Sequence, residues 1–320
     1  MNTMNFKPES LPNSLQPFLE KISATILPTV SMQLTPNNRL TVWQSKVGGK
    51  PYLPLDVAYP LDSHGNPLAL LAQFNFTEIP VLPHFPNKGI LQFYIAADDL
   101  YGMNFDDQQQ QSGFRVLYFD QVIEDTSQLR QDFSEFELGE EDYLPFTGQY
   151  SIEFNLTSQP ISLGDFAFAP KILGTEELYD FEEQFKGGDF EDNFIEPYDE
   201  LASASGHRLG GYPYFTQTDP RQYNEKVQDY ILLFQLDTDD AENDIMWGDS
   251  GVGNFFIHPE DLKMMERYFE KNIKKGIFYI FGFLVLGLIT ILILKFFSLK
   301  FVLSIPMIIV FFILINNKKY

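Results

Sequence analysis

The chain has 320 residues and carries 44 acidic side chains against 22 basic ones, so its formal net charge is −22. A protein this acidic repels the phosphates of DNA and RNA, which excludes sequence-independent binding to nucleic acids. The absence of cysteine excludes disulfides, thiolate zinc sites and cysteine catalysis, while 44% hydrophobic residues suffice for a large core.

The first predicted element is an amphipathic helix over residues 14–27. Its apolar residues recur at the i, i+3, i+4 and i+7 positions that form one helix face. They are Leu15, Phe18, Leu19, Ile22 and Ile26. We expect this helix to pack on the body through that face.

Residues 46–100 recur without a gap 162 positions later, as residues 208–262. KVGGKPYL aligns with RLGGYPYF, LLAQFN with LLFQLD, and GILQFYIAADDL with GVGNFFIHPEDL. Twelve of the 55 aligned positions are identical, where unrelated sequences would share roughly three. The alternative, a coincidence of three short blocks, is much weaker. We therefore predict two copies of one structural unit.

Each copy has the pattern of a β-rich unit. A Gly-Gly turn, in which glycine permits a positive φ, is followed by Pro-Tyr, an apolar strand and an aromatic strand. The predicted fold class is therefore α+β, with internally duplicated and mostly antiparallel β-rich units, peripheral helices and a pseudo-two-fold axis.

The segment between the copies, residues 101–207, contains predicted strands at 114–119 and 150–156. It also contains an acidic insertion over 176–200, with eleven carboxylates and one lysine. Leu178, Phe181 and Phe185 have helical spacing inside the insertion, which predicts a surface helix there.

Two glutamines occupy equivalent places in the two copies, Gln73 and Gln235. We interpret them mainly as buried amides near the pseudo-axis that hydrogen-bond each other, with a shared binding cleft as the alternative. His207 and Arg221 flank the second Gly-Gly turn and are further candidate binding residues. Arg221 follows Asp219-Pro220, which predicts a turn closed by an arginine–carboxylate pair rather than an anion clamp.

Carboxylates concentrate over residues 237–249, between the apolar and the aromatic strand of the second copy. Asp237, Asp239 and Asp249 are candidate ligands for a divalent cation such as calcium or magnesium, because hard cations prefer several oxygen ligands. The spacing does not match an EF-hand, so solvated loop acids are the favoured interpretation. Trp247 is a candidate binding residue, although a packed indole in a tight turn is the simpler expectation.

The C-terminal region changes character after a predicted helix over 260–275. Residues 271–320 comprise a basic flank and two predicted transmembrane helices, at about 276–294 and 299–315. One span followed by a buried or interfacial apolar segment is the alternative. Six basic residues flank the hairpin and two lie in its loop, so the positive-inside rule places both ends in the cytoplasm. Residues 1–11 lack the pattern of a signal peptide. We therefore expect a multi-pass protein of the cell membrane with a cytoplasmic N-terminal domain.

Several blocks together resemble the bacterial YwqG-like family, whose function is undefined. They are SKVGGKPYLP (45–54), PLALLAQFNF (67–76), FPNKGILQFYI (85–95), GHRLGGYPYFTQTDPR (206–221) and ILLFQLDTD…MWGDSGVGNFFI (231–257). The resemblance covers about residues 10–270, and the hydrophobic tail departs from it. It implies an α+β domain over residues 1–270 with internal duplication, and it supplies no catalytic residues.

Two functions fit these observations. The first is a membrane-tethered cytoplasmic binding protein that captures a basic protein, for example an immunity protein that neutralises a basic toxin. The second is a metal-assisted or acid–base enzyme between the copies, using His207, Asp237, Asp239 and Asp249. No recognisable catalytic motif is present, so the binding role is favoured.

Overall fold

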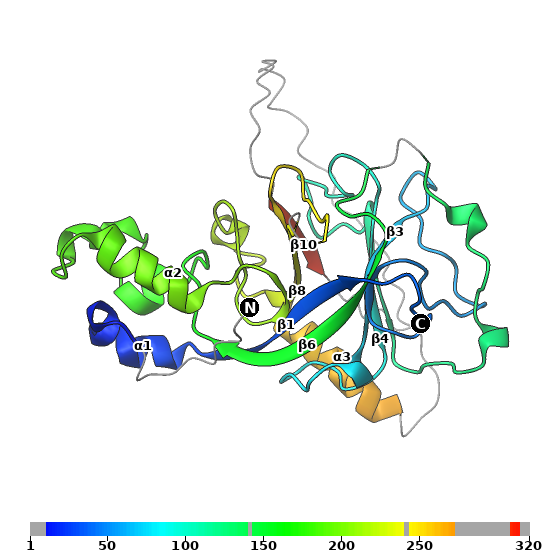
Figure 1. Cartoon of the computed structure of the whole chain (residues 1–320), viewed down its shortest axis with the longest axis horizontal. Coiled ribbons are helices and arrows are strands. Elements are labelled where there is room, and N and C mark those ends of the chain that lie inside the picture. The colour runs from blue at the N-terminus through cyan, green and yellow to red at the C-terminus, as the bar shows by residue number, and fades with distance from the viewer. Residues whose placement is uncertain (1–10, 140–142, 240–242, 273–307, 314–320) are drawn as a thin grey trace, which may run out of the picture.

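A computed structural model of the chain describes residues 11–139, 143–239, 243–272 and 308–313. Nine strands form one antiparallel sheet that curls into a half-barrel (Figure 1). In chain order they are β1 Leu27–Pro36, β2 Lys46–Gly48, β3 Ala69–Asn75, β4 Ile90–Ile95, β5 Phe114–Phe119, β6 Gln149–Gln159, β7 His207–Gly210, β8 Ile231–Asp237 and β9 Val252–Ile257. Their order in the sheet is β9-β8-β7-β1-β6-β2-β3-β4-β5. The predicted mostly antiparallel architecture is confirmed, including the strands expected at 114–119 and 150–156.

Strand pairing repeats at the offset of 162 found in the sequence. Lys46 pairs with Gln73 as Arg208 pairs with Gln235. The β3–β4 register shifts after Leu70, and the β8–β9 register shifts at the equivalent place, after Leu232. The backbone of both halves therefore follows one pattern, down to a shared irregularity.

Both Gly-Gly turns adopt the predicted left-handed conformation. The φ angles are 69° and 74° at Gly48 and Gly49, and 64° and 73° at Gly210 and Gly211. A side chain at Gly48 would also collide with the backbone, because its Cβ would lie 2.5 Å from the carbonyl oxygen of Gly148. Glycine is thus required there both by conformation and by space.

The two halves exchange strands. β1 precedes the first half in sequence but pairs with β7 of the second, so that Val30 lies opposite Leu209. β6 precedes the second half but pairs with β2 of the first, where Tyr150 lies opposite Val47. β1 and β6 then pair with each other over their full lengths. The sheet of each half therefore includes one strand that precedes the other half in sequence. We expect the two halves to fold together as one unit.

The main core lies where the two halves meet. Phe93 and Phe255 occupy equivalent repeat positions, and their ring centroids lie 4.8 Å apart in an edge-to-face contact. Phe74 and Phe234 join them, with centroids 4.8 Å apart, and all four side chains are fully buried. Each such burial contributes about 1.5–3 kcal/mol, so this aromatic cluster is a main link between the halves.

Helices are few and short in the described residues. The predicted N-terminal helix is shorter than expected: a 3-10 turn over Asn13–Phe18 leads into α1, Leu19–Ala24. Pro17 lies within the first part, and a proline in a helix lacks the N–H for the usual bond. The predicted helix near 260–275 is α3, Pro259–Asn272, whose Leu262 and Met265 are buried.

Residues 160–206 fold outside the sheet into a small subdomain around α2, Glu196–Ala202, beside α1 (Figure 1). We call it the acidic subdomain, because it contains the acidic insertion over 176–200. Short helical segments precede α2 at Ala169–Leu173, Tyr179–Gln184 and Glu191–Ile195. Leu15 and Ile22 of the N-terminal segment join Phe168, Phe194 and Tyr198 in a second core. The acidic insertion is thus a packed unit with its own apolar centre.

The predicted membrane tail lies mostly outside the described residues, including all of the first span at 276–294. Among the described helices, none is long and apolar enough to cross a bilayer. Within the second predicted span, Ile308–Ile313 form a strand, β10, which pairs in parallel with β9 (Figure 1). The sequence of these six residues, IIVFFI, consists of β-branched and aromatic residues, which favour strands, and the rest of the second predicted span lies outside the described residues.

Candidate functional site

Gln73 and Gln235 hold equivalent loops in the two halves. Gln73 Oε1 accepts a hydrogen bond from Tyr52 N, and Gln235 Oε1 accepts one from Tyr214 N, each at 2.8 Å. Each Nε2 donates to two backbone carbonyls 29 and 31 positions earlier in the chain, at 2.7–2.9 Å. Both side chains are fully buried and each amide bonds groups of its own half, so the predicted hydrogen bond between the two glutamines is wrong.

Two further buried amides extend these networks, and the repeat alignment did not single them out. Gln92 Nε2 donates to the carbonyl of Tyr52 at 2.6 Å. Its equivalent, Asn254, donates through Nδ2 to the carbonyl of Tyr214 at 2.9 Å. The two positions differ in residue type, and only their offset of 162 could have indicated the shared role.

The structure brings together His207, Asp237 and Asp239, three of the four residues that the enzyme alternative combines. His207 Nδ1 accepts from the backbone N of Asp237 at 3.1 Å, which leaves Nε2 as the protonated nitrogen. That nitrogen lies 3.5 Å from Asp239 Oδ2. Burial raises the pKa of Asp237, although hydrogen bonds from Gly206 and Thr238 partly oppose this rise. Both ring nitrogens face protein groups, so the histidine is placed as a structural link.

Asp249 lies away from this group, exposed in the turn before β9. Within the described ranges, no three histidine or carboxylate side chains converge to hold a metal ion. Trp247 is fully buried and packs edge-to-face on Tyr101, with ring centroids 5.0 Å apart. The packed indole expected from the sequence is therefore confirmed, and Trp247 is part of the core.

Arg221 joins the acidic subdomain to the sheet. Its guanidinium lies 2.6 Å from Asp219 and 2.8 Å from Asp165, and it stacks between Phe166 and Phe256. Burial alone would lower the pKa of Arg221, but the charges of the two aspartates outweigh it and raise that pKa. The predicted arginine–carboxylate pair is confirmed. Asp165 and Asp219 accept hydrogen bonds from the guanidinium N–H groups that would otherwise bind an anion.

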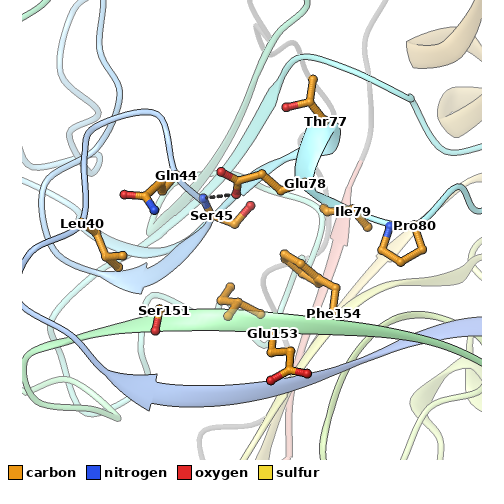
Figure 2. A pocket seen from close by; sticks show the side chains of 11 residues that line it. Leu40, Gln44, Ser45, Thr77, Glu78, Ile79, Pro80, Ser151, Glu153 and Phe154 are labelled. Carbon is orange, nitrogen blue, oxygen red and sulfur yellow. Dashed lines mark hydrogen bonds between the residues drawn. The ribbon is translucent and has the colours of Figure 1, made fainter.

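A pocket of about 490 Å³ opens between β6 and the segment Phe76–Pro80 (Figure 2). Phe154 lies on its floor, Ile79 and Pro80 form a wall, and Glu78 lies above them beside Ser45. Glu78 Oε2 accepts a hydrogen bond from Ser45 N at 2.8 Å, which fixes the carboxylate. Sequence reasoning missed this site because three separate segments contribute to it.

A buried cation lies near this pocket. Lys46 donates to the backbone carbonyls of Thr41 and Lys50. Burial lowers the pKa of Lys46 to about 8, with a smaller opposing effect from Glu78. Its repeat equivalent, Arg208, is likewise buried and donates to the carbonyl of Ser205. Because both cations bind backbone carbonyls, we assign them a structural role.

The surface of the acidic insertion is predominantly negative. All eleven carboxylates between residues 176 and 200 are exposed, and Lys186 is the single basic residue among them. The aromatic residues of the same segment mostly face the second core, with Phe190 and Phe194 buried. Tyr179 is the exception, at 59% exposed. This surface can attract cations, but most of its aromatic groups are unable to anchor a partner.

The chain matches one protein family, described as a domain of unknown function (DUF1963), over residues 45–273. No curated protein matches it significantly. The matched range covers both repeat blocks, the pocket residues Ser45 and Glu78, and the whole acidic subdomain. The chain therefore belongs to the DUF1963 family.

Proposed function

We propose that the protein is a non-catalytic binding module that captures a basic protein, with the acidic insertion as the docking surface. The observation that carries this proposal is the exposure of all eleven carboxylates of residues 176–200 around a packed apolar centre. A fixed array of like charges steers an oppositely charged partner and raises its association rate.

The insertion is a rigidly mounted surface, which favours binding over a flexible tail. The ion pairs of Arg221 with Asp165 and Asp219 connect its base to the sheet. Lys21 Nζ donates to the carbonyl of Ile172 at 2.8 Å, and Tyr212 Oη donates to the carbonyl of Thr25 at 2.6 Å. A preorganised surface loses less entropy when its partner binds.

An immunity-like role is the concrete form of this proposal. A basic toxin such as a nuclease binds phosphates through a cationic face, and an acidic surface covers such a face by charge complementarity. The fold supports this role only through its surface, since His207 and the neighbouring aspartates are occupied by structural hydrogen bonds.

We also propose that the domain is an internal duplication held at the membrane. The equivalent pairings of Lys46 and Arg208 support the duplication of residues 46–100 as 208–262 within one domain. The apolar sequence 276–294 supports membrane attachment with the domain in the cytoplasm. A second span over 299–315 would require Ile308–Ile313 to leave β9, because one segment cannot occupy both places.

The binding proposal is tested by affinity capture. The tagged full chain, co-expressed with its neighbouring gene products, should recover a basic protein at low ionic strength and release it when salt is raised. The salt dependence follows because exposed charges are screened beyond about 10 Å at 0.1 M. Recovery of no basic protein at low salt would count against the proposal.

A further inference from the structure

We propose that the pocket between β6 and residues 76–80 binds the side chain of a lysine or arginine. This inference rests on the proposed function, because it names a specific contact for a basic partner. It goes beyond that function by assigning a second contact site outside the acidic insertion, formed by β6 and the first repeat copy.

The pocket has the two surfaces that a long cationic side chain needs. Ile152 and Phe154 are half-buried and provide an apolar floor, while Ile79 and Pro80 provide an apolar wall. Lysine and arginine place their methylene stems on such surfaces and keep their charged ends in water. Glu78 lies at the exposed end, where it meets that charge (Figure 2).

The charge of the pocket favours a cation over an anion or a neutral group. Its lining includes Glu78 and Glu153 and contains no lysine, arginine or histidine. The ammonium of Lys46 is buried and donates to backbone carbonyls, so it does not neutralise Glu78 by a direct contact. Ser45 N holds only Oε2 of Glu78, and Oε1 remains on the same carboxylate to accept from a ligand.

Comparison with the other half indicates that the open space is specific to this side. The strand pairings relate β6 to β1, so that Ile152 and Phe154 correspond to Met32 and Leu34. Met32 and Leu34 are 6% and 5% exposed, whereas Ile152 and Phe154 are only half-buried. The same surface is thus closed by protein in one half and left open in the other.

The residue type at position 45 also favours open space in this half, because its equivalent in the other half is the larger His207. Ser45 Oγ accepts from Asn75 N at 2.9 Å, and the equivalent His207 Nδ1 accepts from Asp237 N at 3.1 Å. Both side chains therefore accept a hydrogen bond from the equivalent backbone N–H of the neighbouring strand. Serine is the smaller residue, and it leaves space beside Glu78 that an imidazole ring would reduce.

The test measures binding of two small probes to the full chain by NMR titration. n-Pentylamine carries the apolar stem and the charge of lysine, whereas n-pentanol carries the stem alone. We expect the amine to bind at least about threefold more tightly than the alcohol, the size of an exposed ion pair. Equal affinities, or no binding of the amine at this pocket, would overturn the inference.

Two matched variants locate the interaction. Glu78→Gln should remove the preference for the amine. Glu124→Gln makes the same charge change at an exposed residue that does not line the pocket. This control should keep the preference within about twofold. Equal losses in both variants would show a general charge effect and contradict the assignment.

The outcome is separable from that of the proposed function. Small amines do not span the distance to another surface, so neutralising carboxylates of residues 176–200 should leave amine binding at the pocket unchanged. Failure of amine binding with intact capture of a basic protein would reject only the pocket. Amine binding without capture of any basic protein would reject only the docking role of the insertion.

Discussion

Removal of either repeat glutamine should destabilise the fold by a similar amount. Gln73→Met or Gln235→Met would leave one backbone N–H and two backbone carbonyls without their side-chain partner. Each unsatisfied buried group costs about 1–3 kcal/mol, which gives about 3–5 kcal/mol when the loops relax in part. Gln73 also accepts from Gln92 Nε2 at 2.7 Å, so its loss should cost slightly more.

Urea unfolding of the full chain, followed by circular dichroism, measures this effect. The exposed Gln228→Met serves as the control and should change the free energy of unfolding by less than about 0.5 kcal/mol. A cost below about 1 kcal/mol for both buried variants would refute the assigned hydrogen bonds. A large cost for one variant and none for the other would refute the equivalence of the two halves.

Three further substitutions test the packing and the electrostatics. Gly253→Ala would place a Cβ 2.4 Å from Cζ2 of the buried Trp247 and should cost about 1–3 kcal/mol in thermal unfolding; unchanged stability would contradict that contact. The folded pKa of Lys46, about 8, is below its unfolded value, so its stability contribution is lost as the pH falls from about 10 through 8. Lys46→Met should abolish this pH-dependent loss, and identical pH profiles would refute the assignment. The folded pKa of Asp237 is raised, so wild-type stability falls as the pH rises through that pKa. Asp237→Asn, which copies the equivalent Asn75, should flatten this fall in pH-dependent melting, and a steeper fall would contradict it.

The strands and turns shared by the two repeat copies could be predicted from the sequence, because the residues that fix them act on their near neighbours in the chain. Gly48 and Gly210 each need a positive φ, and Gln73 and Gln235 each satisfy nearby loop carbonyls. Such requirements preserve residue identity at fixed spacing. The alignment therefore predicted the strands and turns of both halves.

The exchange of β1 and β6 between the halves could not be predicted from the repeat alignment. Val30 corresponds to Tyr150 at an offset of 120, whereas Val47 corresponds to Leu209 at 162. The difference, 162 − 120 = 42 residues, is the extra length of the connection between β6 and β7, which forms the acidic subdomain, over the connection between β1 and β2. β1 and β6 satisfy backbone pairing with mostly dissimilar side chains, and the single identical pair, Ser31 and Ser151, is too little to mark their equivalence.

The candidate site residues could likewise be predicted only in part. Proximity in sequence singled out His207 and Arg221, and both proved to be buried links with structural partners. The pocket at Glu78 combines Ser45 and Phe154, which are more than a hundred positions apart in the chain. Such a site has no local pattern, and only the folded chain reveals it.

The central claim is that the acidic insertion attracts basic partners because of where its charges lie. Fluorescence anisotropy of a labelled ten-lysine peptide can compare the full chain with two variants of equal charge. One variant neutralises Glu176, Glu182, Glu183, Glu191 and Glu200 to glutamine. The other neutralises five exposed acids elsewhere, Asp99, Asp106, Glu124, Glu137 and Glu225.

The first variant should weaken peptide binding by about tenfold or more at low salt, and the second by less than about threefold. Equal weakening in the two variants would show that net charge alone governs binding, and it would contradict a docking surface on the insertion.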